Sequence, residues 1–140
     1  MQIGVPKESK NHEYRVGLTP ASVDQLVARG HEVWVETTAG SAIVFSDTDF
    51  VKAGAKIMDT YQAFAAPLVV KVKEPQLHEC KRLSPEQVLF CYLHLATAKA
   101  QANALIERGV TAIAYETVTD EKGRLPLLAP MSEVAGRLSV

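Results

Sequence analysis

Short apolar runs alternate along the whole chain with segments that have the spacing and the end signals of helices. Six of these runs are too short to be helices, and several are rich in β-branched or aromatic residues. The six expected strands are residues 2–6, 32–36, 56–58, 68–73, 88–93 and 111–116. Strands that alternate with helices predict an α/β fold: a mainly parallel, twisted, right-handedly wound sheet with helices on both faces, as in flavodoxin-like domains.

The helical segments have recognisable ends. Thr19 is a good N-cap, Pro20 suits the first helical position, and Gly30 stops the first helix. A second helix begins with the capping-box sequence of residues 46–49. The alanine-rich segment 97–108 predicts a further helix of about three turns.

The last segment of the chain has a different pattern. Residues 125–130 contain two prolines and predict an extended connector. A final helix begins at Met131 and has no stop signal before Val140. We therefore expect residues 1–130 to form one α/β domain, and residues 131–140 to be the start of a truncated helix that leads to a partner domain.

Composition excludes several classes of protein. A chain of 140 residues suits one domain, and 15 basic residues nearly balance 16 acidic ones, so neither nucleic acid nor an anionic membrane is an expected partner. The longest uncharged apolar run, residues 64–70, is far shorter than the roughly 20 residues that span a bilayer. The N-terminus lacks a secretory signal, and Cys80 and Cys91 fit neither a metal site nor a disulfide framework. We expect a soluble cytoplasmic domain without a metal.

Polar residues follow several of the expected strands, where α/β sheets bind their ligands. If the strands are placed correctly, Arg15, Lys73, His94 and Glu116 project toward one edge of the domain. Arginine offers a planar fork for a carboxylate, lysine a point charge for a carbonyl oxygen, and histidine a general acid or base. This combination suits a small carboxylic acid that carries a reactive carbonyl.

Each of these residues also has a simpler interpretation. Arg15 could be a solvated surface charge, His94 a hydrogen-bonded core residue, and Glu116 a local cap. Lys71 and Lys73 share one face of an extended strand, so spacing alone does not choose between them. What favours a site is that all these signals converge on the strand ends.

The sequence lacks the common nucleotide and hydrolase motifs. It contains no G-x-G-x-x-G, no G-x-x-x-x-G-K-[ST], no G-x-S-x-G, no C-x-x-C and no H-E-x-x-H. The chain itself therefore has no recognisable loop for a nucleotide phosphate.

Several motifs resemble one enzyme family, in order and at close to family spacing. The opening I-G-V-P-K-E-S-K-N-H-E-Y-R-V and L-T-P-A are similar to the N-terminus of alanine dehydrogenases. Further similar motifs are G-H-E-V, K-V-K-E-P, L-H-L-A, A-Y-E-T and L-P-L-L-A-P-M-S-E-V-A-G-R, at residues 30–33, 71–75, 93–96, 114–117 and 125–137. The first domain of proton-translocating transhydrogenase shares the opening, but K-V-K-E-P and L-H-L-A favour the N-terminal substrate-binding domain of alanine dehydrogenase.

The resemblance implies a reaction and a set of residues. The family oxidatively and reversibly deaminates L-alanine to pyruvate and ammonia with NAD, as a homohexamer in which a Rossmann domain follows the N-terminal segment. Arg15 and Lys73 match its substrate-binding residues, and His94 and Lys73 match its catalytic ones. Ser132 and Met131 match positions on the NAD side of the cleft. The match to Lys73 decides between the two lysines.

We therefore expect the substrate domain of an alanine dehydrogenase, inactive without its NAD-binding domain. Two alternatives remain: the first domain of a transhydrogenase, and a non-catalytic α/β module that binds a carboxylate ligand or a partner protein.

Overall fold

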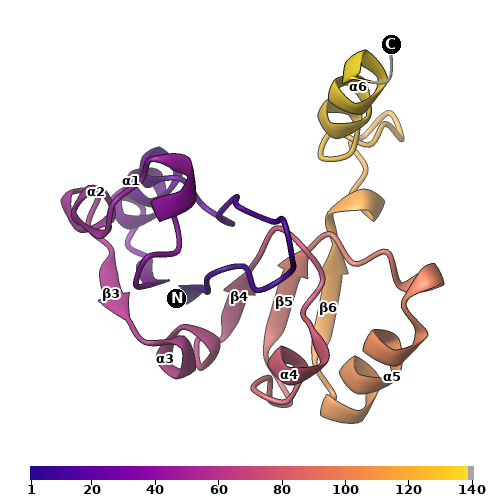
Figure 1. The fold of residues 1–140 in the computed structure, drawn as a ribbon, viewed down its shortest axis with the longest axis horizontal. Helices are drawn as coiled ribbons and strands as arrows, with labels where there is room; N and C mark the ends of the chain where they lie inside the picture. Colours follow the sequence, from indigo (N-terminus) through magenta and orange to yellow (C-terminus); the bar gives the residue numbers. More distant parts are fainter. Residues whose placement is uncertain (139–140) are drawn as a thin grey trace.

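The computed structural model describes residues 1–138 and contains a six-stranded, wholly parallel sheet. The strands are β1 (Gln2–Val5), β2 (Glu32–Glu36), β3 (Lys56–Met58), β4 (Leu68–Val70), β5 (Val88–Cys91) and β6 (Thr111–Ala114), in the order β3-β2-β1-β4-β5-β6 (Figure 1). All six expected strands are present, although four of them end one to three residues earlier than expected. The parallel α/β fold is thus confirmed.

The strand order differs in detail from that of flavodoxin. Flavodoxin-like sheets have the order 2-1-3-4-5, whereas here the chain returns from β3 at one edge to place β4 on the other side of β1. This is the strand order of dinucleotide-binding sheets. The switch between β1 and β4 places the loops after these two strands next to each other.

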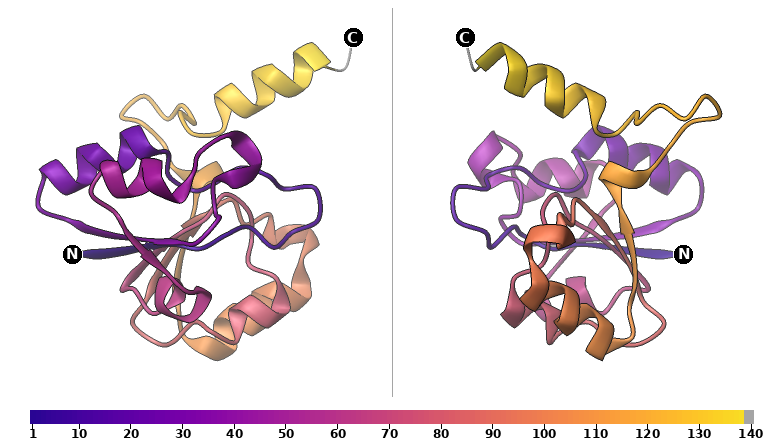
Figure 2. Two further views of the ribbon diagram at one scale, coloured as in Figure 1. Left: turned by 60° about the vertical axis from the view of Figure 1, so that its left-hand side comes forward. Right: turned by 90° about the vertical axis from the view of Figure 1, so that its right-hand side faces the viewer.

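Helices cover both faces of the sheet (Figure 2). They are α1 (Pro20–Ala28), α2 (Asp47–Lys52), α3 (Thr60–Phe64), α4 (Leu77–Cys80), α5 (Lys99–Arg108) and α6 (Ala129–Leu138), with 3-10 turns at Ser41–Ile43, Leu95–Thr97 and Tyr115–Thr117. In the left view of Figure 2, α1 and α2 lie above the sheet and α3, α4 and α5 below it. Among the described residues, none of the helices has both the length and the apolar character that crossing a bilayer requires.

The expected helix caps form as hydrogen bonds. The Thr19 hydroxyl accepts the N–H of Ser22, and Ser46 and Asp49 form the reciprocal bonds of a capping box. The expected helix at 97–108 begins at Lys99, after a short 3-10 turn.

Close packing joins α3 to the sheet. A Cβ added to Gly4 on β1 would lie 1.9 Å from the carbonyl oxygen of Ala63, so only glycine lets the helix approach this closely. The core consists of two apolar clusters, one containing Phe50 and the other Phe64, and both of these side chains are almost fully buried. By contrast β6 lies at the edge of the sheet, with Ile113 43% exposed.

The C-terminal segment differs from the expectation in two places. Residues 126–128 form a turn, where we expected an extended connector. Helix α6 then begins at Ala129, two residues before Met131, because Pro130 is tolerated in a first helical turn that needs no N–H donor. Residues 139–140, the end of the expected truncated helix, lie outside the described part of the chain.

Candidate functional site

A pocket of about 220 Å³ lies at the carboxyl end of the sheet, under the first turns of α6. Its wall is formed by the segments after β4 and β5 and by α6, and its lining residues are Lys73, Tyr92, His94, Leu128, Met131, Ser132 and Ala135. Four of the five residues that the family resemblance assigns to the site therefore line one cavity.

Lys71 and Lys73 have different environments, although both follow β4. Lys71 is fully buried, whereas Lys73 is half-buried in the pocket wall, with its Nζ 5.9 Å from the centre of the Tyr92 ring. The expectation that the two share a face fails because β4 ends at Val70, so the alternation of an extended strand stops before them. Of these two lysines, Lys73 is the one that a ligand in the pocket can reach.

The side chain of His94 is exposed, and a hydrogen bond from its backbone N–H holds the residue in place. The Glu116 carboxylate accepts the N–H of His94 at 2.7 Å and that of Leu93 at 3.1 Å, which fixes His94 in the left-handed conformation (φ 48°). Its ring stacks on that of Tyr92, with 6.1 Å between centroids and 8° between planes. The core-histidine interpretation is therefore wrong.

Glu116 is anionic at this turn. Desolvation raises its pKa, but the backbone N–H groups of His94, of Glu116 itself and of Leu93, with the nearby His94 ring, together outweigh this, so the pKa lies below its usual value. The His94 Nδ1 atom is 3.9 Å from the nearer Glu116 oxygen, which is an electrostatic contact longer than a hydrogen bond.

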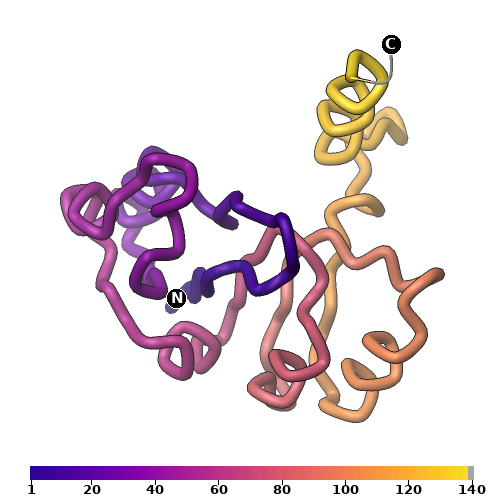
Figure 3. The backbone as a smooth tube through the Cα atoms, in the orientation of Figure 1, coloured from indigo at the N-terminus to yellow at the C-terminus, as the bar shows by residue number. Residues whose placement is uncertain are grey.

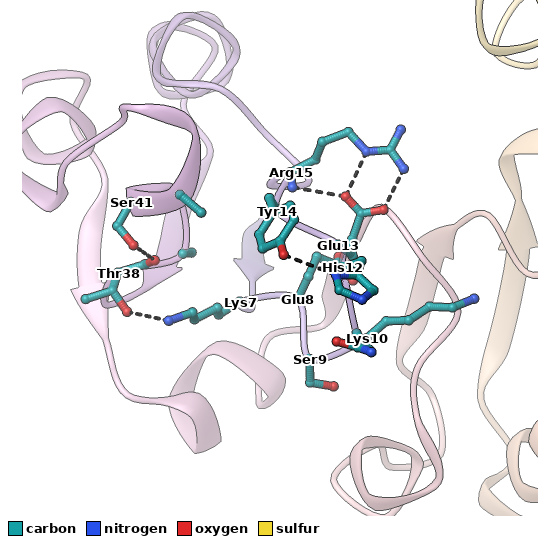
Figure 4. Close-up of a pocket in the computed structure, with 13 residues that line it drawn as sticks. Lys7, Glu8, Ser9, Lys10, His12, Glu13, Tyr14, Arg15, Thr38 and Ser41 are labelled. Atoms are coloured by element: carbon teal, nitrogen blue, oxygen red, sulfur yellow. Dashed lines mark hydrogen bonds and ion pairs between the residues drawn. The ribbon is translucent and has the colours of Figure 1, made fainter. Parts of the chain in front are cut away.

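Arg15 lies beside the pocket and is already paired. Its Nε and Nη2 donate to the two oxygens of Glu13 at 2.8 and 2.6 Å, and Figure 4 shows this pairing on the loop that follows β1. The pairing lowers the pKa of Glu13 and raises that of Arg15. Its Nη1 donates to the sulfur of Met131 at 3.2 Å, which connects Arg15 to the pocket that contains Lys73.

Arg15 also lines a second cavity, of about 390 Å³, whose lining residues are drawn in Figure 4. Its charged residues are largely paired with one another or with neighbouring groups: Lys7 donates to Thr38, Lys10 pairs with Glu74, and Arg15 pairs with Glu13. We therefore place the candidate site in the cavity under α6.

Sequence reasoning missed two residues of the site. The Tyr92 ring contacts both the ammonium of Lys73 and the ring of His94, and Glu13 orients Arg15 through an ion pair. Strand alternation gives no signal for Tyr92, because β5 ends at Cys91 and His94 is in the left-handed conformation. No periodic signal marks Glu13, whose pairing depends on the course of a loop.

The pocket residues fit one edge of a nicotinamide but not a whole dinucleotide. Met131 offers an apolar surface and Ser132 a hydroxyl, beside Lys73 and His94. The chain has no glycine-rich loop for the phosphates. Within residues 1–138, no three His, Cys, Asp or Glu side chains are grouped so that they could hold a metal ion.

Curated relatives cover nearly all of this chain. It is 54% identical to the alanine dehydrogenase of Halomonas elongata over 100% of its length, and 52% identical to that of Mycobacterium tuberculosis over 99%. In both comparisons the chain spans 38% of the relative's length.

Solved structures show the same relationship. An L-alanine dehydrogenase superposes with a TM-score of 0.95 at 52% identity, covering 100% of this chain and 39% of the other. A transhydrogenase from Sinorhizobium meliloti superposes less well, with a TM-score of 0.79 at 28% identity over 83% of this chain and 35% of the other. Residues 4–135 match the family described as Alanine dehydrogenase/PNT, N-terminal domain, and the chain therefore belongs to that family.

Proposed function

We propose that this chain is the substrate-binding domain of an alanine dehydrogenase, which reversibly converts L-alanine to pyruvate and ammonia with NAD. The observation that carries the proposal is the pocket under α6, where Lys73 and His94 lie on Tyr92 and Arg15 reaches Met131. In this proposal residues 1–130 form the substrate-binding domain, and α6, which begins at Ala129, leads to an NAD-binding Rossmann domain.

The chain's own residues bind the substrate and move protons. Arg15 binds the carboxylate through the guanidinium edge that Glu13 leaves open, since a carboxylate is a far better acceptor than the sulfur of Met131. Lys73 places its ammonium on the carbonyl oxygen of pyruvate and so polarises the carbon that ammonia attacks. His94 gives a proton to that oxygen as it leaves as water, and takes one up in the reverse direction.

The bound NAD would supply the hydride chemistry at the substrate α-carbon. Ser132 and Met131 would lie on the nicotinamide side of the pocket, because both belong to the helix that covers it. The proposal also includes a cytoplasmic homohexamer. The high similarity to alanine dehydrogenases over the whole chain supports these parts of the proposal.

The test is an assay of a full-length protein that contains this domain, with pyruvate, ammonia and NADH. We expect Lys73→Ala and His94→Ala each to lower kcat by roughly 10²–10⁴-fold, the range of a lost acid–base or electrostatic group. Lys99→Ala, which removes an exposed lysine from α5, is the matched control and should behave like the parent. All three should keep the parent's melting temperature.

Other outcomes would identify the alternatives. Near-parent kcat in either Lys73→Ala or His94→Ala would contradict its proposed role. A parent that transfers hydride between nucleotides but does not use alanine would be a transhydrogenase, which the structural similarity at 28% identity makes the main rival. A parent that binds pyruvate without any turnover would be a non-catalytic carboxylate-binding module.

A further inference from the structure

Lys71 is fully buried between two carboxylates that the proposed chemistry does not use. Its Nζ lies 3.1 Å from Glu8 Oε2 and 3.2 Å from Glu79 Oε1, and the side chains of both glutamates are 2% exposed. Burial raises the pKa of Glu8, although the charge of Lys71 and the amide of Val72 oppose this. Burying three ionisable groups costs desolvation free energy. A gain in stability alone therefore does not explain why they are buried here.

Glu8 joins the two segments that carry the proposed substrate ligands. It belongs to the loop after β1, which also carries Arg15, and its Oε1 accepts the N–H of Val72 at 2.7 Å. Val72 immediately precedes Lys73. Figure 3 shows the loop after β1 passing across the chain that follows β4, where these bonds form.

A second contact reinforces this connection. Lys10 of the same loop forms an ion pair with Glu74, the residue that follows Lys73. The backbone of Lys73 is therefore tied to the Arg15 loop on both sides, before it through Glu8 and after it through Lys10.

Glu79 contacts the same lysine without joining these segments. Its Oε1 accepts from Lys71, and its Oε2 accepts the N–H of Gln76 at the start of α4. Glu79 therefore stabilises α4 against the segment after β4, but it makes no bond to the loop that carries Arg15.

We propose that Glu8, through Val72 and Lys71, is a positioning residue that fixes the distance between Arg15 and Lys73. This inference depends on the proposed function, in which the two cations hold the carboxylate and the carbonyl oxygen of one small molecule. A substrate held at two points needs that spacing to be set before it binds, because a displacement of about 1 Å can cost 10²-fold in rate.

The experiment compares three variants of the full-length protein with pyruvate, ammonia and NADH. In Glu8→Ala we expect kcat/KM for pyruvate to fall by about 10²-fold, with little change in KM for NADH. Glu8→Gln keeps an oxygen for the Val72 amide and should recover roughly tenfold of this loss. Glu79→Gln removes a charge from the same lysine and should lower the melting temperature while kcat/KM stays within about threefold of the parent.

Equal losses of kcat/KM in Glu8→Ala and Glu79→Gln would overturn the positioning role, because the loss would then follow from general stability. If Glu8→Ala does not fold, the comparison of Glu8→Gln with Glu79→Gln decides, and the former must lose more kcat/KM. Hydrogen exchange supplies a readout without turnover: residues 7–15 and 71–76 should exchange faster together in the Glu8 variant, and unchanged exchange would refute the tie. A parent that does not use alanine would overturn the proposed function but leave this last result valid.

Discussion

The guanidinium of Arg15 is held along one edge by Glu13, through two parallel bonds of 2.8 and 2.6 Å, while its remaining nitrogen lies 3.2 Å from the sulfur of Met131. Glu13 also accepts the backbone N–H of Arg15 at 3.0 Å. The pair therefore sets both the position and the direction of the guanidinium, so that its open edge lies toward α6 and the pocket. In the proposed function, the substrate carboxylate would meet a fork that is already oriented.

Removing this orientation should weaken substrate binding. In Glu13→Gln the neutral amide cannot form the two charge-assisted bonds, so we expect KM for pyruvate to rise roughly tenfold with a smaller change in kcat. The measurement is steady-state kinetics on the full-length protein, with Glu121→Gln, which replaces an exposed carboxylate, as control. A lower KM would mean that Glu13 competes with the substrate for Arg15.

Glu116 should make stability depend on pH in the acid range. The folded-state pKa of Glu116 lies below the ordinary glutamate value of 4.5, so between these two values the unfolded state binds more protons and stability rises with pH. Its contribution is complete above pH 4.5 and is lost as the pH falls through the folded-state value.

Glu116→Gln, which does not titrate, tests this dependence. At pH 7 we expect the full-length variant to be about 1–3 kcal/mol less stable than the parent, because the His94 and Leu93 amides lose a charged acceptor. Denaturant unfolding at several pH values should show the gap narrowing below pH 4.5. A stability difference that stays constant with pH would contradict the lowered pKa of Glu116.

The contact between Gly4 and α3 gives a prediction about the fold. Gly4→Ala places a methyl group 1.9 Å from the carbonyl oxygen of Ala63. Because this oxygen belongs to the backbone and can move only if α3 shifts, we expect the free energy of unfolding to fall by about 3 kcal/mol. Gly30→Ala is the matched control: its backbone is left-handed (φ 83°) but no atom lies within 4 Å of the added Cβ, so it should cost only about 1 kcal/mol. An equal decrease in the free energy of unfolding of the two variants, measured by denaturant unfolding, would mean that α3 shifts freely.

The sequence predicts the features of this fold that depend on neighbours along the chain. The cap at Thr19 and the capping box at Ser46 are confirmed because each is completed within three residues. The sequence pattern predicts ends of β4 and β5 that are too late, because Lys71 and Leu93 continue the pattern after the sheet pairing has stopped. Hydrophobic pattern alone does not define where a ladder of hydrogen bonds ends.

The site divides in a similar way. Parallel strands bring their carboxyl ends to one edge, which is why Lys73, His94 and Glu116 could be grouped before the structure was known. The burial of Lys71 could not be foreseen, because it depends on Glu8, which lies 63 residues away in sequence. Whether Lys73, His94, Arg15, Met131 and Ser132 have their proposed roles stays a prediction.

Ser132 gives the last prediction, which separates the two sides of the pocket. It lies on α6 beside Met131, whereas Lys73 and His94 come from the sheet edge below. If α6 presents the nicotinamide side, Ser132→Ala removes one hydrogen bond to the coenzyme and should raise KM for NADH about fivefold, with KM for pyruvate unchanged. The change removes a single oxygen from an exposed position, so the melting temperature should stay that of the parent. The opposite result, a raised KM for pyruvate alone, would place Ser132 on the substrate side and assign this face of α6 to recognition of alanine.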